Sequence, residues 1–229
     1  MNTRTATHPS VTKTLIRSLQ SASDPAGIRL SLKPRTDVEG ADDASPHDTI
    51  FEEACRHGMA RELFIGLVEY ACQDARDDPR KRDTFYMIRA PLPLIADEQL
   101  QVELERAVEA AALDHARICF EIPEMSFLEP WSQAGLRRVK EQGFQLSLAS
   151  FGSGVAPFEA LYLGLSFLQV SRGYVRECLY NTFSRELVRT TNELAHLGAM
   201  RSIADGVDTV DQVNFLRALG VDYAEGPAI

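Results

Sequence analysis

Carboxylates near the C-terminus stand where the sequence passes from strand to helix. Asp205 and Asp208 follow a short apolar run and precede residues 210–219, whose apolar side chains recur with helical spacing. The next apolar run ends in Glu225. In a barrel of parallel strands, the chemistry lies at the carboxyl ends of the strands. These carboxylates are therefore candidate functional residues, and their side-chain type is compatible with acid–base chemistry.

The elements that would position these carboxylates alternate between strand and helix. Such alternation indicates parallel strands joined by right-handed crossovers. With about seven strands, the pattern favours an α/β fold of the TIM-like (β/α)8 barrel type over an open doubly wound sheet. The apolar patterns predict strands at 84–90, 117–122, 145–150 and 167–171, and one on each side of the last helix. They predict helices at 97–112, 131–142, 157–163, 184–197 and 210–219.

The N-terminal part follows this alternation less regularly. Residues 1–10 are expected to be disordered, and 11–22 to form a helix with three apolar side chains on one face. Residues 28–32 alternate as a strand. The acidic segment at about 34–49 has almost no apolar side chain, so it is expected to be a mobile loop.

A helical pattern follows the acidic segment. It covers residues 50–74 and is interrupted near Gly58. Either Asp48 or Thr49 is expected to cap this helix. Glu52 stands three residues after Thr49, which is the spacing of a capping box.

Composition limits the classes of partner. The formal net charge of -9 and the pI near 5.1 argue against nucleic acid and anionic lipid as partners. No apolar run is long enough to cross a bilayer, and the first residues lack the apolar core of a signal peptide. The four cysteines form no C-x-x-C pair, so they are expected to be reduced and mostly buried. We expect a cytoplasmic protein without a membrane segment.

Four stretches resemble, in order and spacing, the motifs of the EAL-domain family. The resemblance covers about residues 11–226 and implies a single degenerate barrel domain of EAL type over 11–229. The family consists of bacterial phosphodiesterases that linearise cyclic di-GMP on a modified TIM barrel. The stretches are ICFEIPE at 118–124, ASFGSG at 149–154, FLQVSRGYV at 167–175, and IADGVDT at 203–209 followed by GVDYAEG at 220–226.

The resemblance also implies which residues would hold the two divalent cations of the family. Glu121 matches a metal-binding glutamate of the family. The Glu-Ala-Leu motif that names the family is expected on a strand soon after Lys33-Pro34, and no such tripeptide stands there. That strand region is therefore expected to be shortened or missing. The asparagine on the next strand corresponds to Ile88 or Arg89, neither of which is an oxygen ligand for a cation.

The resemblance implies that the later motifs have also lost residues that bind the cations in the family. Ala149 and Ser150 stand in place of the paired aspartates of the family, and Gln169 in place of its lysine. Two family glutamates are shortened to Asp205 and Asp208, and Glu225 replaces a glutamine. Hard divalent cations need several oxygen ligands, so the resemblance implies no metal, no cofactor and no catalytic residue.

The remaining carboxylates would repel one another without a cation. Glu121, Asp205, Asp208 and Glu225 are expected near one barrel mouth, where like charges raise at least one pKa. Arg89, on the strand next to that of Glu121, is the candidate to neutralise them. A register slip of one residue would instead point Arg89 outward. The alternative interpretation, which we favour for the carboxylates, is that they are inherited turn caps and hydrogen-bond acceptors.

Two further segments have a functional and a structural interpretation. The loop of Phe151, Gly152, Ser153 and Gly154 could hold a phosphate or a partner through its backbone N–H groups, but a tight turn is the favoured explanation. The apolar run 158–168 lies near a dimer contact in the family. It could be a partner surface, although a buried junction between helix and strand is favoured.

These observations give four hypotheses for function. The first is a catalytically inactive EAL-like domain that acts as a regulator or adaptor through protein–protein contact in bacterial cyclic di-GMP-related signalling, with a homodimer as an alternative assembly. The second is a receptor that binds cyclic di-GMP without cleaving it, which the acidic mouth disfavours. The third is an active phosphodiesterase. The fourth is a different barrel hydrolase with Glu121 and Asp205 as acid and base.

Overall fold

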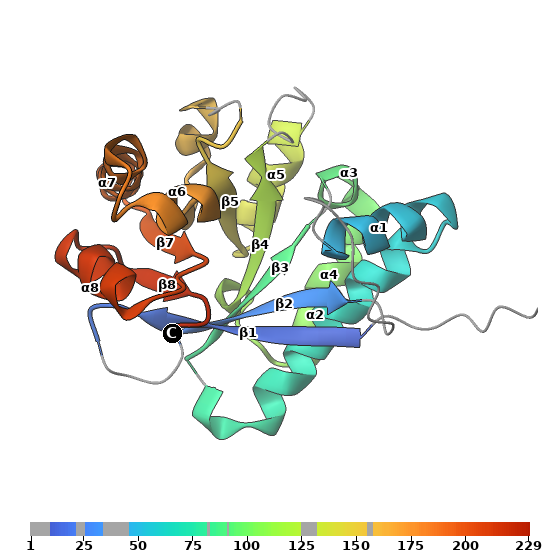
Figure 1. Cartoon of the computed structure of the whole chain (residues 1–229). Helices are drawn as coiled ribbons and strands as arrows, with labels where there is room; N and C mark the ends of the chain where they lie inside the picture. Colours follow the sequence, from blue (N-terminus) through green and yellow to red (C-terminus); the bar gives the residue numbers. More distant parts are fainter. Residues whose placement is uncertain are drawn as a thin grey trace, which may run out of the picture.

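The computed structural model describes residues 10–21, 26–33, 46–81, 83–90, 92–124, 132–154 and 158–229. Eight strands in chain order close into a barrel (Figure 1). From β2 to β8 all neighbours are parallel, whereas β1 is antiparallel to both β2 and β8. The strands are β1 (Ser10–Ser18), β2 (Gly27–Lys33), β3 (Phe85–Arg89), β4 (Ile118–Pro123), β5 (Gln145–Phe151), β6 (Phe167–Val170), β7 (Arg201–Asp205) and β8 (Tyr223–Glu225).

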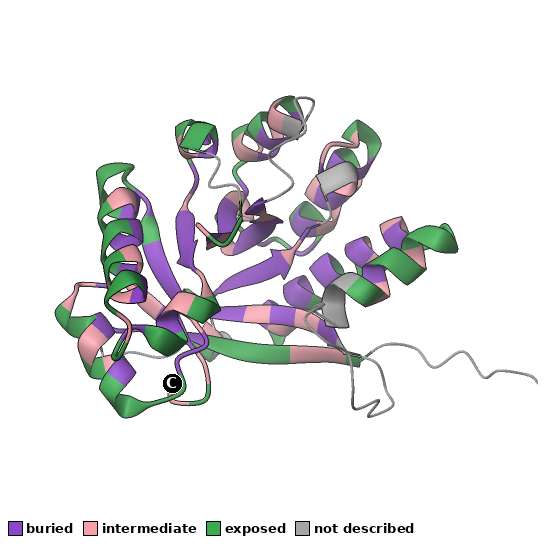
Figure 2. Ribbon diagram, turned by 45° about the horizontal axis from the view of Figure 1, so that its top comes forward, coloured by how far each residue is buried: buried purple, intermediate pink, exposed green. Residues whose placement is uncertain are grey.

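Helices pack around the parallel strands, with exposed residues on their outer faces and buried residues on those strands, whereas β1 is largely exposed (Figure 2). The predicted α/β barrel is thereby confirmed. Within the described ranges, no helix is both long and apolar enough to cross a membrane. The helices are α1 (Pro46–Arg56), α2 (Ala60–Asp77), α3 (Leu92–Ile95), α4 (Glu98–Ala110), α5 (Ser132–Glu141), α6 (Arg172–Glu177), α7 (Thr182–Leu197) and α8 (Val210–Ala218), with 3-10 helices at Pro79–Lys81, His115–Arg117 and Phe158–Leu163.

The first element corrects the sequence interpretation. Residues 11–22 were expected to form a helix, but β1 spans Ser10–Ser18 and pairs with β2 from Ser10 opposite Lys33 to Ile16 opposite Gly27. The stretch is rich in β-branched side chains, which favour a strand. Residues 1–9 of the expected disordered segment lie outside the described residues.

The expected missing strand is also present. β2 is seven residues long and joins the closed barrel, so the prediction of a shortened or missing strand region is wrong. Most of the acidic segment, residues 34–45, lies outside the described residues. Its last part is helical, because α1 already begins at Pro46. Asp48 and Thr49 therefore lie inside α1 and do not cap it.

Helix boundaries elsewhere follow local signals. The interruption near Gly58 separates α1 from α2, as predicted. Asp97 caps α4, and Thr209 with Gln212 forms a capping box at α8. The short α6 was not predicted. The four cysteines are free, and all except Cys55 are buried.

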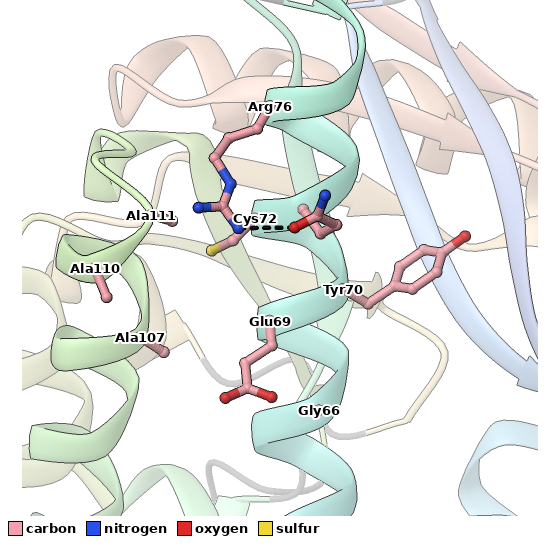
Figure 3. Close-up of a pocket in the computed structure, with 9 residues that line it drawn as sticks. Gly66, Glu69, Tyr70, Cys72, Arg76, Ala107, Ala110 and Ala111 are labelled. Atoms are coloured by element: carbon pink, nitrogen blue, oxygen red, sulfur yellow. Dashed lines mark hydrogen bonds between the residues drawn. The ribbon is translucent and has the colours of Figure 1, made fainter.

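A groove lies between two of the outer helices, α2 and α4, which pack side by side (Figure 3). It encloses about 550 Å³. Alanines line the α4 side of the groove, whereas the α2 side also carries larger side chains, among them Tyr70 and Arg76. Its lining residues are Gly66, Glu69, Tyr70, Cys72, Gln73, Arg76, Ala107, Ala110 and Ala111.

Candidate functional site at the barrel mouth

A simple alternation along the strands divides the barrel interior into an apolar floor and a polar mouth. Side chains two residues apart on a strand share a face. The floor is a buried apolar cluster, and a polar residue follows two positions later at the carboxyl end of the same strand. The pairs are Met87 and Arg89, Cys119 and Glu121, Phe167 and Gln169, Ile203 and Asp205, and Tyr223 and Glu225.

Arg29, on β2, lies at the centre of this polar mouth. Its guanidinium forms ion pairs with Glu121 of β4 and Glu225 of β8. The Arg29 Nε atom also donates to Oε2 of Glu225 over 2.9 Å. Both glutamates are only 2% exposed, and the Arg29 side chain is 15% exposed. The contacts therefore join β2 to β4 and to β8, neither of which is a neighbour of β2 in the sheet.

A neutral side chain completes the surroundings of this guanidinium. Gln169 accepts a hydrogen bond from Nη2 of Arg29 at 3.0 Å. The Gln169 amide nitrogen in turn donates to Oγ of Ser147 at 2.7 Å and approaches the sulfur of Met87 at 3.4 Å. The amide orientation is fixed by these partners, so the Gln169 oxygen is directed at Arg29.

The electrostatics of the pair follow from burial and mutual attraction. Burial disfavours the charged guanidinium, but the carboxylates of Glu225 and Asp205 outweigh it and raise the pKa of Arg29. Burial is also the main cause that raises the pKa of Glu225, with a further contribution from Asp205, while Arg29 opposes the shift. Arg29 is therefore the charge that limits the rise in the pKa of Glu225.

Other arginines pair with the outer carboxylates. Arg172 and Arg176, on α6, bind Asp205 and Asp208, each at 3.0 Å. These pairs are more exposed than the inner group, which consists of Arg29, Glu121 and Glu225. About half of each arginine side chain is accessible. The Nη1 atom of Arg89 lies 3.4 Å from Oε1 of Glu121, a longer contact than those of Arg29. Asp208 thus lies at the rim, outside the inner group.

The glycine loop is held by a buried carboxylate. Glu124, directly after β4, accepts hydrogen bonds from the backbone N–H groups of Gly152 at 2.9 Å and Gly154 at 2.8 Å. The Ser153 hydroxyl lies 3.5 Å from the same carboxylate. The N–H groups that could hold a phosphate are therefore directed at a glutamate of the chain itself. Phe151 is the last residue of β5 and packs edge-on against the ring of Phe158.

The donor set does not fit a pair of divalent cations. The guanidinium of Arg29 occupies the space between Glu121 and Glu225, and Ala149 on β5 offers no oxygen. In the described ranges, no group of three or more His, Cys, Asp or Glu side chains is arranged to bind a metal. A hard cation needs several oxygen ligands.

Some residues of this site were predicted from the sequence. The structure brings Glu121, Glu225 and Asp205 to the mouth, and Arg89 beside Glu121. It also reveals Arg29, which sequence reasoning missed because the strand at 28–32 was read only for its apolar face. A charged residue at the alternate position of an otherwise apolar strand was the available signal.

The model of the EAL domain family matches residues 30–229. Among curated relatives, the probable cyclic di-GMP phosphodiesterase PdeA of Escherichia coli K12 is 28% identical over 93% of this chain. The probable cyclic di-GMP phosphodiesterase PdeB of the same organism is 22% identical over 78% of this chain. This chain covers only 31% of PdeA and 34% of PdeB, so it spans about a third of these relatives.

Solved structures share the barrel. The PaMucR phosphodiesterase in complex with c-di-GMP is similar with a TM-score of 0.82 at 19% identity, over 95% of this chain and 89% of that one. The FimX EAL domain from Pseudomonas aeruginosa bound to c-di-GMP is similar with a TM-score of 0.79 at 17% identity, over 95% and 88% of the two chains. At these identities the likeness establishes the fold.

Proposed function

The chain belongs to the EAL domain family, and from this premise we propose that it is a non-catalytic member that regulates cyclic di-GMP-related signalling by binding another protein. The observation that carries the proposal is the guanidinium of Arg29 between Glu121 and Glu225. In the family, hydrolysis depends on cations that activate water and stabilise charge on the phosphoryl oxygens. Here the carboxylates of the mouth are bound by arginines instead.

The order of the strands adds support. The Glu-Ala-Leu motif belongs on the strand before that of the family's asparagine, and the strand before β3 is β2. We infer that Arg29-Leu30-Ser31, on β2, occupies the positions of this motif. The motif glutamate is then replaced by a residue of opposite charge. The segment after Pro34, where the motif was first expected, lies outside the described residues.

Exposed aromatic side chains support a protein partner. Phe158 and Tyr162, on the 3-10 helix after β5, are 56% and 88% exposed. Tyr180, between α6 and α7, and Phe183, in the first turn of α7, are also exposed. Aromatic residues are enriched in interfaces between proteins. We infer that the partner, another protein or a second copy of this chain, contacts the helix at Phe158–Leu163.

A receptor that binds cyclic di-GMP without cleaving it is the second candidate. The c-di-GMP complexes of the structural relatives favour it. The acidic chain and the engagement of the Gly152 and Gly154 N–H groups by Glu124 disfavour it.

One set of titrations separates these candidates. Cyclic di-GMP is titrated calorimetrically into the protein with and without Mg²⁺ or Mn²⁺, and the products are analysed by chromatography, with PaMucR phosphodiesterase as the positive control. We expect neither heat nor linear dinucleotide. Micromolar binding without cleavage would favour the receptor, and metal-dependent appearance of the linear product would overturn the proposal.

The partner contact has its own measurement. Sedimentation velocity of the protein and of Tyr162→Ser reports self-association, and cross-linking in a bacterial lysate followed by mass spectrometry reports other partners. We expect cross-links from the helix at Phe158–Leu163 in the wild-type protein, and their loss in Tyr162→Ser. A monomer whose cross-links are unchanged by the substitution would contradict this surface.

A further inference from the structure

We infer that Arg29 is a built-in counter-cation at the barrel mouth, and that replacing it uncovers a divalent-cation site formed by Glu121 and Glu225. The inference deepens the non-catalytic part of the proposed function and does not depend on the partner. Glu121 and Glu225 come from opposite strands of the barrel, β4 and β8, and Arg29 binds both of them.

The contacts of Arg29 meet the needs of both carboxylates. One nitrogen of the guanidinium faces Glu121, and two others face Glu225. A planar guanidinium binds carboxylates through parallel N–H donors, whereas a spherical cation would bind the same oxygens by coordination. Gln169 accepts the remaining contact at 3.0 Å. The arginine therefore fills the coordination that a cation would otherwise provide.

The charge balance of the inner group depends on this one residue. With all three side chains ionised, Arg29 contributes +1 and Glu121 and Glu225 contribute -1 each, so the group carries -1 with the arginine and -2 without it. Both carboxylates are almost fully buried. Removing one partner of a buried ion pair leaves an uncompensated charge, which strongly destabilises a fold. A divalent cation would restore the balance in such a variant.

The neighbouring side chains keep the arginine in place. Ser147 and Met87 fix the amide of Gln169, and Gln169 directs its oxygen at the guanidinium. On β2, Gly27 stands two residues before Arg29 on the same face, and an added Cβ there would lie 2.4 Å from the ring of Phe85. The apolar floor thus closes the space below Arg29, and the guanidinium stays at the level of the glutamates.

Thermal unfolding in EDTA and in Mn²⁺ tests the inference. The variants are Arg29→Met, which removes the charge, and Arg29→Glu, which adds a third carboxylate. We expect the wild-type midpoint to be the same in EDTA and in Mn²⁺. We expect Arg29→Met to unfold about 10 °C lower in EDTA and to recover part of that loss in Mn²⁺. The recovery of Arg29→Glu should be larger, because it offers more oxygen ligands.

Arg61→Met is the matched control. Arg61 also bridges two carboxylates, those of Asp97 and Glu103, but on the surface of the protein. Its loss should shift the midpoint by only about 2 °C and create no response to Mn²⁺. Adding Glu225→Gln to Arg29→Met should abolish the recovery in Mn²⁺, which places the cation at this pair.

Several results would overturn the inference. One is a wild-type midpoint that rises in Mn²⁺ and loses this rise in Glu121→Gln. Another is a folded Arg29→Met and a folded Arg29→Glu that both ignore Mn²⁺, and a third is failure of both to fold even with Mn²⁺. Cleavage of cyclic di-GMP by the wild-type protein would contradict the proposed function, whereas variants without a metal response in an inactive protein would contradict only this inference.

Discussion

The backbone N–H of Gly152, directly after β5, donates a hydrogen bond over 2.9 Å to Oε1 of Glu124, directly after the neighbouring strand β4. Gly152 has a φ of +82°, and its carbonyl accepts from the hydroxyl of Tyr174 at 2.7 Å. Glu124 is only 5% exposed. This buried carboxylate therefore fixes a loop whose donors would otherwise face the mouth.

The first prediction follows from this contact. Glu124→Ala leaves the N–H groups of Gly152 and Gly154 without the carboxylate, and we expect a loss of about 2 kcal/mol in the free energy of unfolding. Amide exchange of both glycines should become faster, as measured by NMR. Glu124→Gln keeps one acceptor oxygen and should lie between wild type and Glu124→Ala. Equal exchange rates in all three proteins would contradict the assignment.

The second prediction separates the inner from the outer arginines. Arg176→Met removes an ion pair with Asp208 in which the arginine side chain is about half exposed, and exposed pairs contribute little. We expect a change below about 1 kcal/mol in urea unfolding, with Arg29→Met costing about 3 kcal/mol or more. Similar costs for the two variants would mean that burial does not decide the strength of these pairs.

The barrel could be predicted from the sequence because its parallel strands are short apolar runs between amphipathic helices. β3 to β8 lie within a few residues of their predicted positions. β1 was assigned wrongly because Ile16 and Leu19 fit a helical face, although they belong to two different apolar clusters. Pairing with β2, a contact between distant residues, decides its conformation.

The centre of the site was less accessible to sequence reasoning. Glu121 and Glu225 could be placed at a mouth because each ends a strand. Arg29 could not be joined to them, because it stands 196 residues before Glu225 and its partner is decided by closure of the barrel. Arg172 and Arg176 were missed for a simpler reason, since α6 is too short to have a periodic pattern.

The third prediction concerns acid stability and Asp74, on α2. Burial alone would raise its pKa, but hydrogen bonds from Lys13, Lys81 and Tyr86 outweigh burial and lower the pKa below its ordinary value. The distances to Lys81 Nζ and the Tyr86 hydroxyl are 2.7 and 2.9 Å. Because the folded pKa lies below the unfolded one, this carboxylate stabilises the fold above about pH 4 and loses that contribution as the pH falls further.

Asp74→Asn tests this assignment. Urea unfolding between pH 7 and pH 3 should show a smaller loss of stability on acidification than in the wild type, together with lower stability at pH 7 because both lysines lose their charged partner. Asp77→Asn, at the exposed end of the same helix, should keep the wild-type pH dependence. A parallel pH dependence for Asp74→Asn and wild type would assign the acid sensitivity to other carboxylates.

The last prediction concerns the turn that holds Glu225 in place. Gly226 directly follows it, with a φ of +145°, and an added Cβ would lie 2.4 Å from the backbone nitrogen and oxygen of Val207. Backbone atoms cannot give way as a flexible side chain can. We therefore expect Gly226→Ala to cost about 3 kcal/mol or more in the free energy of unfolding.

Gly66→Ala is the opposite case and the control. Gly66 lies inside α2 at the groove, and an added Cβ there meets nothing within 4 Å. Alanine should stabilise this helix by about 0.5–1 kcal/mol. Urea unfolding of both variants measures the two effects. Because Gly226 positions Glu225 against Arg29, its variant should also be less sensitive to a second substitution, Arg29→Met, whereas Gly66→Ala should leave the cost of Arg29→Met unchanged.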